Sequence, residues 1–428
     1  MKKPAGILYA SAYLACSTAW GVVNGWLLYF YLPPSGTPLV PVALFSLVML
    51  LSRGVNIAIT LPVGYLSDRT RTRWGRRMPY IVPGALCVPI LFYLLWTPPH
   101  AGQSIWNLIY LAIVMLAFNV AYEIFQTPYD SLLPELIPDE KGRISTSAWE
   151  SAFQLLGAIL AGFAGPLIEK AGYADMALIY AAGTAAFLLI PLAFLRERRS
   201  VIAVPVTATF RESIRLTFSN RHFVIFTASY ALFWMATTFI LETMPYIVTE
   251  ICRLSEADTV YFYLPAVLVS LLCFPLVSWL AKRVGKERLF RTSLLGGAIV
   301  LPGLMLIGDR IPMPLIAQGI SWIVLEAALL SGAQALPTAI AAEITDLDEK
   351  ATGQRREGAI YAIWGLLDQL AAGVASAALP LFLLLGRSAD DPRGPLGIRL
   401  LGLAGGIFLF LAYLVFRQYD RAQSQTRS

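Results

Sequence analysis

The chain has 428 residues, of which 57% are hydrophobic and 14% are charged. In soluble domains, about a quarter of the residues are charged. Its apolar residues recur in blocks of about 20 to 30, each long enough to cross a ~30 Å hydrocarbon core as a helix. Outer-membrane barrels are disfavoured, because their strands are shorter and alternate. The net charge of +6 comes from short loops and forms no continuous basic face, so we expect no nucleic-acid partner.

Reactive side chains are few and scattered. The four cysteines have no paired spacing, and the two histidines flank predicted spans, so we expect no disulfide framework, no metal site and no cofactor. A nucleophile with a base at suitable spacing and a Gly-Lys-Ser/Thr phosphate loop are both missing from the sequence. The sequence therefore predicts that the protein is not an enzyme.

The apolar blocks predict twelve membrane-spanning helices. Because twelve is even, both termini lie on the same side of the membrane. Most lysines and arginines fall in the loops on that side, and basic residues in short loops are retained in the cytoplasm. We therefore expect both termini to be cytoplasmic. The expected spans are 7–32, 39–66, 79–96, 104–133, 145–168, 176–195, 223–248, 260–280, 289–307, 313–342, 358–385 and 396–416.

Internal repetition divides the chain into two halves. The loop after the second span contains the basic segment 64–79, and the loop after the eighth span contains the basic segment 278–286; each has a glycine where a tight turn is expected. A second echo relates 128–141 to 337–350. Two parallel six-helix repeats are typical of carriers that bind solute near the midplane. The expected parts are an N-terminal bundle (1–195), a cytoplasmic linker (196–222), a C-terminal bundle (223–416) and a cytoplasmic tail (417–428).

Three ordered stretches carry a resemblance to a known family. They are GYLSDRTRTRWGRRMP at 64–79, PYDSLLPE at 128–135 and TGQRREG at 352–358. They resemble signature segments of the major facilitator superfamily and, within it, of the glycoside-pentoside-hexuronide:cation symporter group, to which the melibiose carrier belongs. The resemblance implies an all-α membrane protein with twelve helices in two pseudo-symmetric six-helix bundles. It also implies solute transport, in many members of a sugar or sugar derivative, driven by sodium or protons.

The charged site residues that the resemblance implies are mostly replaced. In sugar-transporting members, the second span has an arginine followed by aspartates three and seven residues later, whereas here Arg53 is followed by Asn56 and Thr60. Sodium needs several oxygen ligands and usually a carboxylate, so we expect the family's sodium site to be absent or weakened. The other changed positions are Cys16 and Ser17 in the first span, Gln126 in the fourth and Gln369 in the eleventh.

Ionisable side chains within spans are functional candidates, because each costs at least ~2.5 kcal/mol on insertion scales and usually faces a cavity or a partner. Arg53 pairing with Glu123 or Glu150 would bury both charges together. Such a pair either holds the N-terminal bundle together or serves a substrate or a proton. Both alternatives stay open from the sequence.

The C-terminal half holds acids without an obvious base. Asp368, beside Gln369 and close to Trp364, is the leading candidate for a proton carrier. Glu326 comes next, and Glu123 of the N-terminal half completes the proton-coupling candidates. Glu242 lies nearer the outer end of its span, where we expect it to reach water.

Deep aromatic and amide residues are candidates for a solute cavity, because an aromatic ring can stack on a sugar and an amide can bond its hydroxyls. The same residues would suit an amphipathic solute, and packing alone is the other explanation for each of them. The candidate binding residues are Trp20, Asn24, Arg53, Asn56, Asn119, Tyr122, Gln126, Trp149, Glu150, Gln154, Trp234, Trp364 and Gln369.

The loop after the second span predicts a conformational latch. Carboxylates favour helix N-termini and cations favour C-termini, so Asp68, Arg69, Gly75, Arg76 and Arg77 would hold one state of a two-state carrier by contacts across the bundles. The simpler alternative is that these arginines only fix the topology.

The sequence predicts a secondary active transporter that works by alternating access on a small neutral polar solute, with a sugar or glycoside as the first choice. We expect coupling to protons rather than to sodium, contact with membrane lipid, a monomeric state and residence in a bacterial inner membrane. The alternatives are a non-transporting membrane assembly factor, or a uniporter or exporter of a non-sugar organic solute on the same scaffold.

Overall fold

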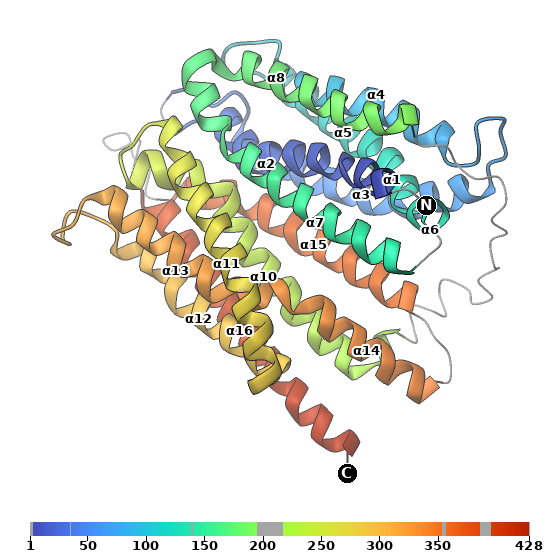
Figure 1. Ribbon diagram of the computed structural model, residues 1–428. Helices are drawn as coiled ribbons and strands as arrows, with labels where there is room; N and C mark the ends of the chain where they lie inside the picture. Colours follow the sequence, from blue (N-terminus) through green and yellow to red (C-terminus); the bar gives the residue numbers. More distant parts are fainter. Residues whose placement is uncertain are drawn as a thin grey trace. The chain divides into compact units, whose positions relative to one another are not determined.

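A computed structural model describes residues 3–34, 36–137, 140–194, 217–352, 357–385 and 395–427. Within these ranges the chain is helical, with one isolated bridge between Thr72 and Gly75 (Figure 1). In this described part of the chain, ten helices are long and apolar enough to cross a membrane, and Met78–Leu94 is a shorter apolar helix. The prediction of an all-α integral membrane protein is confirmed.

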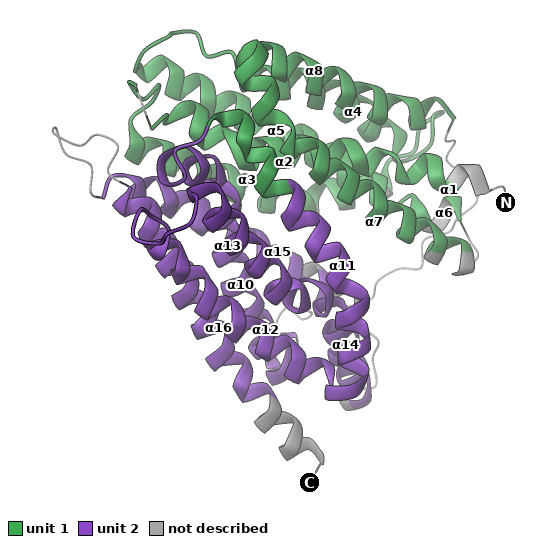
Figure 2. Cartoon of the chain, turned by 60° about the vertical axis from the view of Figure 1, so that its left-hand side comes forward, with its two compact units in different colours: residues 1–204, 255–263 green, residues 205–254, 264–428 purple. Residues whose placement is uncertain are grey.

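The chain forms two compact units, coloured separately in Figure 2. Unit 1 contains Met1–Val204 and Ser255–Tyr263, and unit 2 contains Pro205–Leu254 and Leu264–Ser428. The sequence assigned Ser255–Tyr263 to the second bundle, but its contacts place it in unit 1. The expected linker at 196–222 falls mainly outside the described residues.

Unit 1 follows the predicted spans closely, including the break between the fifth and the sixth. The non-helical backbone of Gly172 (φ 82°, ψ 172°) interrupts α8, so α7 and the first part of α8 form the fifth span and the rest of α8 forms the sixth. Glycine adopts this positive φ without the steric cost that a side chain brings. The helices of unit 1 are α1 (Lys3–Ala10), α2 (Ala12–Tyr31), α3 (Val42–Arg69), α4 (Met78–Leu94), α5 (Ile105–Asp130), α6 (Leu133–Leu136), α7 (Glu140–Gly162) and α8 (Ala164–Phe194).

Small residues let the helices of unit 1 approach closely. A Cβ added at Gly157 of α7 would lie 2.7 Å from the Leu14 carbonyl oxygen and 2.8 Å from Ser17 Cβ of α2. In membranes, close backbone approach replaces the hydrophobic driving force between helices. The stretch beginning at Gly157 therefore serves helix packing.

The segment Ser255–Tyr263 packs on α8 of unit 1. Its short 3₁₀ helix η2 (Glu256–Thr259) lies against Gly165, where an added Cβ would overlap the Glu256 carbonyl and the Thr259 hydroxyl. The Ala257 backbone N–H donates to Glu169 Oε2 at 2.9 Å. Only a residue without a side chain fits at Gly165, so the glycine in the α8 sequence provides the room in which this segment packs.

Unit 2 contains the remaining six predicted spans. The tenth span divides into α13 and α14 at Pro337, because proline lacks the N–H that would continue the helix and suits the first position of a new one. The last helix continues to Arg427, beyond the expected end of the span at 416. The elements are α10 (Arg221–Tyr246), η1 (Ile247–Ile251), α11 (Val260–Val284), α12 (Lys286–Val300), η3 (Leu301–Leu306), α13 (Leu315–Ala335), α14 (Pro337–Thr352), α15 (Glu357–Leu383) and α16 (Leu396–Arg427).

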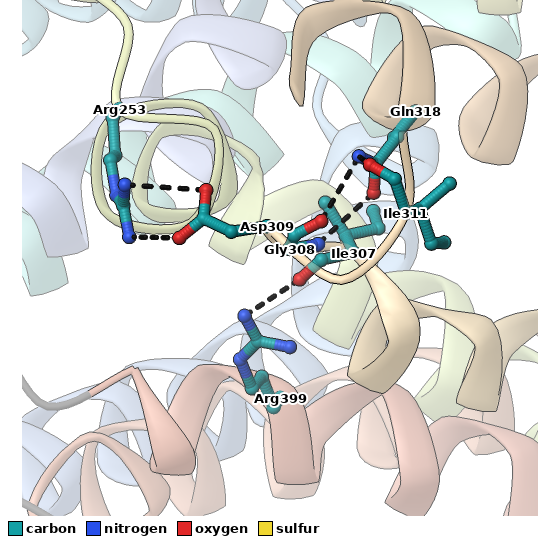
Figure 3. Close-up of polar contacts among 7 residues, drawn as sticks. All are labelled: Arg253, Ile307, Gly308, Asp309, Ile311, Gln318 and Arg399. Atoms are coloured by element: carbon teal, nitrogen blue, oxygen red, sulfur yellow. Dashed lines mark hydrogen bonds and ion pairs between the residues drawn. The ribbon is translucent and has the colours of Figure 1, made fainter. Parts of the chain in front are cut away.

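Polar side chains fasten the loop between η3 and α13 of unit 2 (Figure 3). The Gln318 side chain accepts from the Gly308 N–H at 3.0 Å and donates to three carbonyls of this loop. Arg399 of α16 donates to two further carbonyls just before it, and Arg253 pairs with Asp309 at 3.0 Å. Two side chains, Gln318 and Arg399, therefore bond the backbone of this loop, and Arg253 holds one of its side chains.

Candidate functional site

The guanidinium of Arg53 on α3 lies against α2. Its Cζ is 4.9 Å from the centroid of the Trp20 ring, and Nη2 donates to Asn24 Oδ1 at 3.3 Å. A cation over an indole face gains roughly 0.5 to 2 kcal/mol. The three predicted binding residues Trp20, Asn24 and Arg53 therefore meet in unit 1.

Glu123 on α5 is 6% exposed and is surrounded by hydrogen-bond donors. Thr127 Oγ1 donates to its Oε2 at 2.9 Å, and Asn56 and Thr60 of α3 hydrogen-bond to the same carboxylate. The two residues that replace the family's span-2 aspartates thus serve a carboxylate on another helix. The ion pair expected between Arg53 and Glu123 or Glu150 stays a prediction.

A carboxylate that the sequence reasoning missed, Asp130, organises the end of α5. Its Oδ1 accepts hydrogen bonds from Tyr13 Oη at 2.5 Å and from Gln126 Nε2 at 2.6 Å. Cys16 Sγ donates to Gln126 Oε1 at 3.2 Å, which turns the amide group toward Asp130. The signal in the sequence was the i, i+4 spacing of Gln126 and Asp130, since such pairs share a helix face.

Two stacked tyrosines hold α1 beside this group. Tyr9 and Tyr129 stack with ring centroids 4.7 Å apart, and each hydroxyl donates to the backbone carbonyl of the other residue, at 3.1 and 2.7 Å. The Tyr9 and Tyr13 hydroxyls are 3.3 Å apart. These contacts fix the start of the first span against α5.

The remaining unit 1 candidates are dispersed. Tyr122 packs edge-on against Trp20, with centroids 5.3 Å apart, and the fully buried Asn119 donates to the Ser52 carbonyl. Trp149 and Gln154 on α7 have exposed side chains. Glu150 is half-buried, and its Oε1 has no hydrogen-bond partner among the residues that the structure describes.

Unit 2 places Asp368 of α15 within a group of aromatic rings. Trp364, one turn earlier, contacts Phe226 and Tyr230 of α10 at centroid distances of 5.4 and 5.3 Å. Within the described ranges, neither Asp368 Oδ1 nor Trp364 Nε1 has a hydrogen-bond partner, and both atoms are buried.

The other candidates of unit 2 differ in their surroundings. Glu326 of α13 is 7% exposed, and no hydrogen bond reaches it from the described part of the chain. Trp234 packs on Tyr230, and Gln369 is partly buried beside Asp368. Among the described side chains, no group of three His, Cys, Asp or Glu residues could hold a metal ion.

The expectation that Glu242 reaches water is wrong. The side chain is 7% exposed, and Ser376 Oγ of α15 donates to its Oε1 at 2.5 Å. The sequence placed Glu242 near a span end by counting residues, but the partner comes from a neighbouring helix that the count does not include.

The tight turns of the loop motif occur in both halves, as predicted. Gly75 and Gly285 have φ values of 109° and 94°. Arg77 is 6% exposed and donates to the Ser131 carbonyl at the end of the fourth span. Lys286 pairs with Glu343 of α14 at 2.8 Å, so each basic loop is tied to the fourth helix of its own unit.

The individual latch residues are placed only in part. Arg69 lies over the Tyr65 ring at 4.1 Å, and Arg76 is partly buried. The Asp68 side chain lies outside the described residues. A latch between the two bundles stays a prediction.

Sequence comparison gives one family match over nearly the whole chain. The family model described as "MFS/sugar transport protein" matches residues 8–420. An isoprimeverose transporter of Lactiplantibacillus pentosus is 24% identical over 393 residues, which cover 88% of this chain and 79% of the relative. A glucuronide carrier protein homolog of Escherichia coli (strain K12) is 21% identical, covering 96% of this chain and 91% of the relative.

Solved structures show the same fold. A nucleoside transporter, NupG, matches with a TM-score of 0.70 at 12% identity, covering 98% of this chain and 99% of that one. A POT family transporter in complex with 5-aminolevulinic acid matches with a TM-score of 0.72 at 13% identity, covering 99% and 97%. At these identities the likeness establishes the architecture alone.

Proposed function

Because this chain belongs to the MFS/sugar transport protein family, whose members compared above are transporters, we propose that it carries a neutral polyhydroxylated solute, a sugar or glycoside, together with protons. The chain is a multi-pass membrane protein and a secondary transporter of the major facilitator type, not an enzyme.

The charges inside the spans favour a neutral solute. In unit 1, Arg53 contacts an aromatic ring and an amide, while the carboxylate of Glu123 is buried on α5. In unit 2, Glu326 and Asp368 lie within spans. An acidic interior disfavours anions such as hexuronides and admits neutral hydroxylated molecules. The isoprimeverose transporter among the relatives supports a sugar.

The observation that carries the proposal of proton coupling is Asp368. A carboxylate buried without a partner is costly when it is charged, and a proton removes the charge without requiring further ligands. Sodium would need several oxygen atoms around it. In unit 1, Asn56, Thr60 and Gln126 stand where the family resemblance implies acids for sodium, and they hydrogen-bond to Glu123 and Asp130.

The test is uptake into proteoliposomes with the driving force controlled. A proton gradient should drive accumulation of a neutral sugar. Asp368→Asn should abolish this uphill uptake while leaving the exchange of solute across the membrane intact. Glu326→Gln makes the same acid-to-amide change at a second buried acid. Accumulation driven by a sodium gradient alone, at constant pH and clamped voltage, would refute proton coupling.

A non-transporting role requires a different outcome. If no solute of a broad panel shows saturable flux and a protein partner co-purifies in fixed proportion, the chain is an assembly factor on a transporter scaffold. Uptake of uronates alone would instead restore Arg53 as a carboxylate-binding residue.

The proposed setting is the inner membrane of a bacterium, with both termini cytoplasmic and the protein working as a monomer. Exposed apolar side chains such as Leu272 and Ile299 are proposed to face lipid. The two halves would expose the solute to alternate sides of the membrane in turn. Accessibility of cysteines introduced at each terminus to an impermeant thiol reagent in intact cells tests the orientation.

A further inference from the structure

We propose that Trp364 and Asp368 together bind one hydroxyl group of the transported solute, with the indole N–H donating to the hydroxyl oxygen and Asp368 Oδ1 accepting its proton in a hydrogen bond. This inference rests on the proposed function, because it takes a hydroxylated solute as the ligand. It goes further by assigning the residue pair that selects the solute.

The first observation is a pair of complementary vacant hydrogen-bonding groups. Trp364 Nε1 is a donor and Asp368 Oδ1 is an acceptor; both are buried, and neither has a partner among the described residues. Trp364 is 8% exposed. A buried polar group without a partner costs about 1 to 3 kcal/mol, and native proteins rarely leave such groups unpaired without a reason.

The second observation is their register. Trp364 and Asp368 are four residues apart on α15, so their Cβ atoms lie about 5 to 6 Å apart on one helix face. In the proposed complex, the hydroxyl oxygen of the solute lies between these two side chains. Asp368 as a whole is only partly buried, whereas its Oδ1 is covered.

The third observation is that the indole is held by other rings. Phe226 and Tyr230 of α10 and Tyr361 of α15 contact it at centroid distances of 5.4, 5.3 and 5.6 Å. Rings packed in this way fix the direction of the N–H, and a donor with a fixed direction loses little entropy when it binds. Aromatic walls also suit the apolar faces of a sugar ring.

The chemistry of this pair selects a hydroxyl group. A hydroxyl both accepts from the indole and donates to the carboxylate. An ammonium group only donates, and an ether or carbonyl oxygen only accepts, so each would leave one of the two groups unpaired. A site built for hydrogen bonds to a hydroxyl rejects the analogue that lacks it much more strongly than an apolar pocket rejects a missing methylene.

The pair also brings the solute and the proton to one carboxylate. With a proton on Oδ2, Oδ1 remains an acceptor for the solute hydroxyl, and the buried carboxyl group is neutral. Loss of the proton from Oδ2 restores the charge in the aromatic surroundings. The solute hydroxyl and the proton can therefore occupy Asp368 at the same time, each on a different oxygen.

The experiment uses the full-length protein in detergent and a ligand found by thermal-shift screening of neutral sugars. The probes are that sugar, its monodeoxy analogues and its mono-O-methyl ethers. In the wild type, removing or methylating one particular hydroxyl should weaken binding about tenfold to a hundredfold, as expected for leaving a buried group unpaired.

The variant that tests the pair is Trp364→Phe, which keeps an aromatic ring and removes the N–H. The penalty for losing that one hydroxyl should fall severalfold in this variant, while penalties at the other positions persist. Trp322→Phe is the matched control, because Trp322 Nε1 donates to the Val300 carbonyl at 2.9 Å; this variant should keep the full pattern of penalties.

The outcomes separate the two proposals. An unchanged penalty pattern in Trp364→Phe, with sugar uptake intact in the wild type, overturns the assigned pair and leaves the proposed function standing. Absence of sugar binding and uptake in the wild type overturns both. Circular dichroism and the melting temperature of each variant show whether it is folded, so loss of folding is not mistaken for loss of recognition.

Discussion

Asp130 of unit 1 and Asp368 of unit 2 are both carboxylates near predicted solute-binding residues, but their surroundings are opposite. Asp130 Oδ1 accepts from two side chains, whereas Asp368 Oδ1 is buried without a partner in the described structure. A carboxylate with fixed donors is stabilised as the anion, and one without them gains from a proton or a ligand. Asp130 therefore holds its helices together, whereas Asp368 is available to bind a proton or a ligand.

Giving Asp368 a permanent partner should have the largest effect. Gly365 lies one turn earlier on α15, and an added Cβ there would meet nothing within 4 Å, so Gly365→Lys can place an ammonium beside the carboxylate. We expect proton-driven accumulation to fall at least tenfold, because a paired carboxylate no longer needs a proton to be neutralised. Uptake driven by a pH gradient measures this.

The matched control is Gly365→Gln, which has a long side chain without the charge. It should retain most of the accumulation. Equal loss in both variants would show that bulk at this position, and not charge, stops transport.

Removing the carboxylate of Asp130 should affect stability before coupling. Asp130→Leu removes the acceptor of the Tyr13 hydroxyl and of the Gln126 amide, which costs two hydrogen bonds of about 0.5 to 1.5 kcal/mol each. We expect a lower melting temperature in detergent, and an unchanged number of protons carried per solute among the molecules that remain folded. A changed proton stoichiometry would remove the distinction between the two carboxylates.

Tyr13→Phe removes one of the two donors to Asp130 while keeping the ring. Gln126 still donates to the same oxygen, so the loss should be limited to one hydrogen bond, about 0.5 to 1.5 kcal/mol. Thermal unfolding of this variant beside Asp130→Leu measures the share of each donor. A loss as large as that of Asp130→Leu would mean that Tyr13 alone holds the group.

A third carboxylate, Asp68, should show the smallest effect. A contact between its charge and a helix dipole is worth about 0.3 to 1 kcal/mol, so Asp68→Asn should slow turnover about two- to fivefold through the balance between states. Solute affinity should stay close to the wild-type value. Affinity and rate falling in equal proportion would place Asp68 in folding or binding instead of in a latch.

The sequence predicted the helices well and their polar contacts less well. Apolar blocks of span length determine the helices, and Gly75 and Gly285 could be identified as turns because their residue type matches the backbone they adopt. The role of Asp130 was missed because its partner Tyr13 is separated by 117 residues, and only the packing of two helices brings them together. Glu242 was misjudged for the same reason, since Ser376 comes from another span.

The packing of η2 on α8 predicts how the protein behaves when it is divided into two fragments. Cutting the chain near the boundary at 204 leaves the second fragment with Ser255–Tyr263, a piece of unit 1. Expressed together, the two fragments should reassemble in the membrane, because the second carries the segment that fits against Gly165 and Glu169 of the first. From Tyr263 the chain continues to Pro265 within α11, where the missing N–H of proline weakens the helix. In a complementation assay, the segment Ser255–Tyr263 would hold the second fragment to the first, beside this weakened point of the helix.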